Sequence, residues 1–193
     1  MIKRKPYTEI IFKDSKDFRP NLTPREIFSL GSFGGTYWRP IYSSITKKKY
    51  KNLYLNYPDS WWKDIPKNHL TSKIYDTEVN KYNKQVGSSL EEWEKPRPNP
   101  WITKYNPYGW IHWYCDYYNG KRTPDDKRQI KRWNAFAGER GRFRKWLVTQ
   151  ILNKNKEWDD YTVSPVIRQG LQHWGYQLTK KDFDSEVKQR KKN

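Results

Sequence analysis

The sequence predicts a mainly α-helical protein of the α+β class, with a compact helical C-terminal half and a small extended or β portion in the N-terminal half. Three observations lead to this fold. Repeated helix-start signals follow Pro100, a run of Trp and Tyr at helical spacing lies within residues 105–118, and β-branched and aromatic residues follow a glycine pair at 34–35.

The N-terminal elements are short. Residues 1–20 are expected to form an extended arm, in which residues 7–12 resemble a short strand. A helix is expected at 24–30, because Thr23 and Glu26 form a capping box and a proline occupies the first helical position.

The next segment carries weaker signals. The glycine pair permits positive φ or a close backbone approach, and residues 36–45 are expected to be extended. A short helix should begin near Asp59 and end at Pro66, and residues 88–93 carry another capping signal. Residues 67–87 are polar and have no clear period.

The second half is expected to be helical after a stiff, proline-rich spacer at 96–100, which is a candidate internal boundary. A single globular domain at 21–183 should then end in a frayed basic tail at 184–193. The expected helices span residues 107–119, 124–137, 141–152 and 165–174, and a short fifth helix begins near residue 179.

The helix at 107–119 is expected to be central, because it is apolar nearly all round. Trp110, Trp113 and Tyr117 share one face with Tyr114. Aromatic stripes at this spacing are more often core than binding platform. The only cysteine, Cys115, should be a small buried hydrophobe and not a nucleophile.

The composition combines 33 aromatic residues with a formal net charge of +18 in 193 residues. Nucleic acid needs both features in a partner, since its phosphates attract cations and its bases stack on aromatic rings. An acidic protein surface or a membrane headgroup is the alternative partner. A single cysteine excludes an internal disulfide and a cysteine-based zinc site. Without a signal peptide or an apolar span, the protein is expected in the cytoplasm, the nucleus or a viral particle, and not to be secreted.

Residues 121–145 concentrate the charge, with ten cations against three acids. Like charges on one face repel, so a same-sign face is more easily explained by a bound polyanion than by solubility alone. An ordinary solvated surface remains the alternative. The residues expected to contact phosphate are Arg122, Arg128, Lys131, Arg132, Arg142, Arg144 and Lys145.

Further contacts are expected outside this segment. Candidate surfaces for stacking on bases lie in turn-rich sequence, at Tyr37, Trp38, Trp61 and Trp62, although such rings are more often buried in the core. From these parts of the chain the predicted nucleic-acid contacts are Trp38, Arg39 and Arg168.

The sequence gives little support to an enzymatic function. The three histidines are far apart, and no phosphate-binding loop or nucleophile motif occurs. A sequence pattern of metal-dependent nucleases is matched by Pro58-Asp59 and Asp125-Asp126-Lys127. The second part of the pattern, however, falls at a helix start instead of on a strand. No catalytic residue, metal ligand or cofactor is therefore predicted. His173 is expected to satisfy the carbonyls at the end of its helix.

Several strings of the chain resemble an uncharacterised protein family of large DNA viruses and microbial eukaryotes, over about residues 30–180. They are GGTYWRPIYSS at 34–44, NPYGWIHWYC at 106–115, DDKRQIKRW at 125–133, and SPVIRQ at 164–169 followed by HWGY at 173–176. The resemblance implies a viral or unicellular source. It implies no activity and no site residue.

The expected function is binding of DNA or RNA, driven mostly by phosphate contacts and with limited sequence specificity. One alternative is a structural or virion-associated protein that binds an acidic partner. Another is a metal-dependent enzyme acting on nucleic acid, which would require acids such as Asp59, Asp116, Asp125, Asp126 or Glu92 to meet in one cleft.

Overall fold

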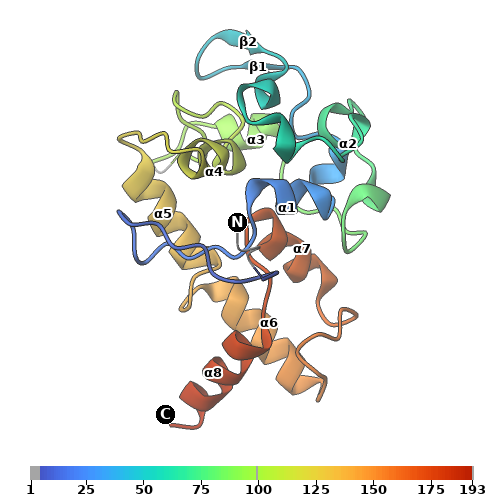
Figure 1. The fold of residues 1–193 in the computed structure, drawn as a ribbon, viewed down its shortest axis with the longest axis vertical. Coiled ribbons are helices and arrows are strands. Elements are labelled where there is room, and N and C mark those ends of the chain that lie inside the picture. Colours follow the sequence, from blue (N-terminus) through green and yellow to red (C-terminus); the bar gives the residue numbers. More distant parts are fainter. Residues whose placement is uncertain (1–4, 99, 193) are drawn as a thin grey trace.

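The structure, a computed structural model, describes residues 5–98 and 100–192 and confirms the mainly α-helical class (Figure 1). The small sheet is an antiparallel hairpin of β1 (Ile41–Ser43) and β2 (Lys48–Tyr50), with Tyr42 opposite Lys49. The α-helices are α1 (Pro24–Ser29), α2 (Asn68–Thr71), α3 (Leu90–Glu94), α4 (Trp110–Tyr118), α5 (Asp126–Phe136), α6 (Arg142–Asn153), α7 (Pro165–His173) and α8 (Lys180–Arg190).

Short N-terminal elements and the last helix lie at opposite ends of the molecule (Figure 1). In Figure 1 the hairpin lies with α2 and α3 at one end, whereas α6 and α8 form the other. Between them, α1 and α7 lie near the centre of the view, and α5 and α6 follow one another along its length. None of the helices formed by the described residues has the length and apolar character that a membrane span requires.

Several helices begin where the capping signals indicate. Thr23 accepts a hydrogen bond from the Glu26 backbone N–H, and the Glu26 carboxylate accepts one from the Thr23 backbone N–H. Ser89 caps α3 by accepting from the Glu92 N–H. In each case a side chain satisfies a backbone donor that the first helical turn leaves unpaired.

Helix α4 begins without such a cap, because Gly109 precedes it with a φ of 87°. The missing acceptor comes from a distant side chain. The Tyr37 hydroxyl accepts from the His112 backbone N–H at 2.8 Å and donates to the Tyr108 carbonyl at 2.7 Å. Tyr37 therefore fastens the segment after the glycine pair to the start of the central helix.

The core is aromatic, as expected, with α4 at its centre. Trp113, Tyr114 and Cys115 are fully buried, and burial raises the pKa of the Cys115 thiol well above its ordinary value. Phe18 from the N-terminal arm is also fully buried and meets Trp133 edge-on, with ring centroids 5.1 Å apart. The arm is thus part of the core, although its described residues, 5–20, form no helix or strand.

Two short segments of the N-terminal half differ from expectation. Residues 7–12 form no strand, since their only ladder contact is an isolated bridge between Phe12 and Ser15. The helix expected from Asp59 to Pro66 is a single 3-10 turn at Asp59–Trp61. In each segment an aromatic side chain packs on the core, Phe12 on Tyr117 and Trp61 on Tyr57, and this packing outweighs the local backbone preference.

The C-terminal tail is also different, because it is helical and not frayed. Helix α8 continues to Arg190, whose guanidinium donates to the Thr149 hydroxyl at 2.9 Å and to the Lys145 carbonyl at 3.0 Å on α6. Arg190 also pairs with the buried Glu186 at 2.8 Å. These bonds hold α8 against α6.

Candidate functional site

Two of the predicted phosphate contacts are partly exposed but already paired. Arg122 bonds the Asp14 carboxylate at 2.6 Å, and its guanidinium lies 3.7 Å from the centroid of the Tyr117 ring. Arg128 bonds Asp125 at 2.5 Å. A nucleic-acid phosphate would have to compete with these carboxylates.

Two other predicted contacts are structural, which corrects the expectation from sequence. Arg144 forms an ion pair with Asp182 at 2.9 Å, and each side chain is 11% exposed. Arg168 is buried and donates to the carbonyls of Val163, Trp158 and Asp160. A buried cation needs such partners, so neither guanidinium is presented to solvent.

The predicted stacking surface at Trp38 is wrong for a similar reason. Trp38 is fully buried, and its ring packs 5.2 Å from that of Tyr108. Trp62 is buried too, and the half-buried Trp61 stacks on Tyr57 at 5.3 Å. The half-buried Arg39 donates to the Thr36 carbonyl at 3.2 Å. This aromatic cluster fills the core instead of facing solvent.

A set of exposed cations remains on and between α5 and α6. None of them forms an ion pair with any residue that the structure describes, although acids partner other cations nearby. We call this set the α5–α6 cations, and it consists of Lys127, Lys131, Arg140, Arg142 and Lys145.

An exposed tryptophan accompanies these cations. Trp146 on α6 is 56% exposed and lies one turn after Arg142. The sequence carries a signal for this exposure, because Trp146 falls outside the apolar stripe of Phe143, Leu147 and Ile151 on the same helix. A large aromatic ring outside the buried stripe is expected to face solvent.

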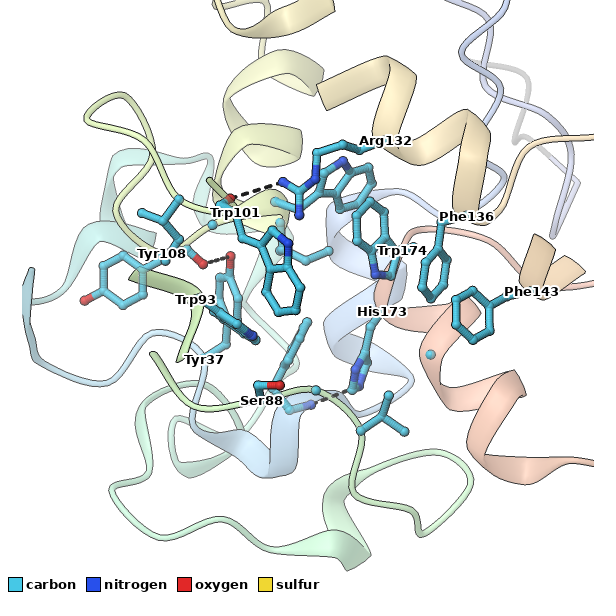
Figure 2. Close-up of a pocket in the computed structure, with 18 of the residues that line it drawn as sticks. Tyr37, Ser88, Trp93, Trp101, Tyr108, Arg132, Phe136, Phe143, His173 and Trp174 are labelled. Carbon is cyan, nitrogen blue, oxygen red and sulfur yellow. Dashed lines mark hydrogen bonds between the residues drawn. The ribbon is translucent and has the colours of Figure 1, made fainter. Parts of the chain in front are cut away.

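A large cavity of about 690 Å³ opens beside the same two helices (Figure 2). Its walls come from α3, the segment between α3 and α4, the start of α4, and α5, α6 and α7. In Figure 2 the rings of Trp93 and Trp101 lie on one side and those of Trp174, Phe136 and Phe143 on the other. The sequence did not predict this cavity, because its walls are far apart along the chain.

Two predicted contacts do meet at the cavity. Arg132 spans one edge, where it donates to the Trp101 carbonyl at 3.1 Å and lies 5.4 Å from the Trp174 ring centroid (Figure 2). Burial, together with nearby Arg128, lowers the pKa of Arg132 to about 10, which leaves it charged at neutral pH. Arg142 is a further lining residue. The cavity is therefore aromatic with two cations at its walls.

His173 lines the cavity in its neutral form, with Nε2 as a hydrogen-bond acceptor and Nδ1–H as a donor. Its Nε2 accepts from the Phe33 backbone N–H at 3.2 Å and lies 2.9 Å from the Gln169 Nε2. The Gln169 amide orientation is fixed, because its oxygen accepts from the Tyr82 N–H. His173 Nε2 is thus an acceptor, and the proton sits on Nδ1. Burial lowers the pKa of His173 to about 3. Its role differs from the predicted bonds to helix-end carbonyls.

Trp110 also lines the cavity. Its ring stacks between Tyr114, at 5.2 Å, and Trp174, at 4.8 Å. The indole Nε1–H is buried and has no hydrogen-bond partner in the described part of the chain. Most buried indole N–H groups find a hydrogen-bond partner, and an unsatisfied buried donor is energetically costly.

The acids that an enzyme would need are used elsewhere. Asp116 accepts hydrogen bonds from Tyr57, Asn106 and Lys121. Asp126 accepts from the Trp113 indole at 2.8 Å. Over residues 5–98 and 100–192, no group of three or more His, Cys, Asp or Glu side chains is placed to hold a metal ion.

No family model matches the chain, and no curated protein or solved structure is significantly similar to it. The resemblance to a family of large DNA viruses and microbial eukaryotes therefore stays a prediction.

Proposed function

We propose that the protein binds nucleic acid, with the α5–α6 cations in contact with phosphates. The observation that carries this proposal is the absence of acidic partners for these five cations among the described residues. Side chains on a surface shaped only by solubility are usually of mixed sign. Unpaired cations close to exposed aromatic rings are typical of surfaces that bind nucleic acid.

Phosphate contacts would dominate the affinity. Each cation that neutralises a phosphate releases a counterion, so affinity falls linearly with salt on a log–log scale. If all five cations engage, the slope should be about −3.5 for a single strand and about −4.5 for a duplex. Such contacts carry no sequence information by themselves, and sequence specificity should be limited.

The test is fluorescence anisotropy with labelled single-stranded DNA, duplex DNA and RNA, between about 50 and about 300 mM salt. In the test variant Lys127, Lys131, Arg142 and Lys145 become Gln. The matched control changes four exposed lysines on or next to the hairpin to Gln, namely Lys47, Lys48, Lys49 and Lys51. Figure 1 shows the hairpin at the end of the molecule opposite α6.

We expect the test variant to lose both affinity and salt dependence, and the control to lose much less. Equal losses in both variants would show that the binding is diffuse and would contradict the proposed surface. If no nucleic acid binds the wild-type protein at low salt, the proposal fails. The same cations would then face an acidic protein partner or solvent.

A further inference from the structure

We infer that the aromatic cavity between α3 and α7 receives one unstacked nucleobase of a bound single strand. This inference rests on the proposed function, and it assigns a base-binding site to it. Three features of the cavity support it, namely its shape, an unsatisfied donor at its wall and its charge.

The shape suits a flat ring. At about 690 Å³ the cavity lies within the usual size range of small-molecule sites. Figure 2 shows open space between Trp101 on one side and Trp174 and Phe136 on the other. A planar base inserted there would meet aromatic faces, and stacking of this kind stabilises binding for every base.

A hydrogen-bond donor at the cavity wall suits a ligand with acceptors. The His173 Nδ1–H forms no hydrogen bond with a described residue, and His173 lines the cavity. Nucleobases carry carbonyl oxygens and ring nitrogens at their edges, which accept hydrogen bonds. A hydrocarbon ligand would leave this donor unsatisfied.

The charge favours a base attached to phosphate. Arg132 and Arg142 line the same cavity, and Arg142 also belongs to the α5–α6 cations. A strand following these cations would carry its phosphates past the cavity edge while one base turned inward. Since a base in a duplex is already stacked and paired, we expect a preference for single strands.

The test uses single-stranded DNA carrying one 2-aminopurine, whose fluorescence reports stacking, and an end label for anisotropy. Ala135 is an exposed α5 residue that lines the cavity, so Ala135→Phe should fill the site without removing a cation. Ala135→Ser is the matched control, because it keeps the space. A second strand has an abasic position in place of the 2-aminopurine, so it lacks the base that would enter the cavity.

For the wild-type protein and Ala135→Ser, we expect a change in 2-aminopurine fluorescence on binding. Ala135→Phe should abolish that change and weaken binding by roughly 5- to 150-fold, the loss of one base–aromatic stack. The abasic strand should bind both variants equally.

The outcomes separate the two proposals. If anisotropy shows binding but Ala135→Phe changes neither signal, the base site is wrong and the phosphate surface stands. If no strand binds, the proposed function fails. If 2-aminopurine nucleoside monophosphate alone occupies the cavity while strands do not bind, the cavity serves a free nucleotide and the inference is overturned.

Discussion

Tyr37→Phe should destabilise the protein far more than the loss of one exposed hydroxyl would. The hydroxyl accepts from the His112 backbone N–H and donates to the Tyr108 carbonyl. Because Tyr37 is only 4% exposed, water cannot readily replace either bond. Each buried backbone group left unpaired costs about 1–3 kcal/mol, so for the two groups we expect a total loss of about 2–6 kcal/mol.

The matched control is Tyr42→Phe, since the Tyr42 ring on β1 is 54% exposed. Urea titration gives the free energy of unfolding, and thermal unfolding followed by circular dichroism should show a Tm lower by about 4–24 °C for Tyr37→Phe. If the two variants agree within about 0.5 kcal/mol, Tyr37 does not act as the cap of α4, and the reasoning is refuted.

Two further predictions concern glycine geometry and pH. An added Cβ at Gly31, where φ is +78°, would lie 1.7 Å from the Val79 carbonyl oxygen, whereas one at Gly120 would meet nothing within 4 Å. Both Ala variants carry backbone strain of about 1 kcal/mol, but urea titration should show a much larger loss for Gly31→Ala, and similar losses would contradict this packing. Burial lowers the pKa of His112 to about 4 and that of His173 to about 3. Between about pH 6.5 and these values the unfolded chain binds a proton at each histidine and the folded protein does not, so the free energy of unfolding falls with falling pH over that range. The free energy of unfolding from urea titrations at decreasing pH should fall by about 1.4 kcal/mol per histidine and pH unit, and less steeply for His173→Gln; an unchanged slope in that variant would show that His173 is not responsible.

The fold class could be predicted because its signals are local. Capping residues at Thr23 and Ser89 and the aromatic spacing of α4 all act within a few residues. The cap that Tyr37 provides could not be predicted, since it joins residues 75 positions apart. Local patterns contain no information about such a contact.

The site was predicted only in part for the same reason. By residue type Arg144 and Arg142 are equivalent cations, yet Arg144 is mostly enclosed by its ion pair with Asp182 and Arg142 is exposed. Which cation finds an acid depends on how α8 packs on α6, a tertiary contact. The aromatic cluster around Trp38 was ambiguous in the same way, because rings suited to stacking on bases are equally suited to a core.

The cavity exists only when the whole chain is folded, because Trp93, Arg132 and Trp174 come from segments far apart in sequence. Occupancy and folding are therefore a single linked equilibrium. A ligand present at about 100 times its dissociation constant would raise the free energy of unfolding by about 2.7 kcal/mol. The thermal stability of the unlabelled protein can therefore rank nucleotides and unrelated compounds alike.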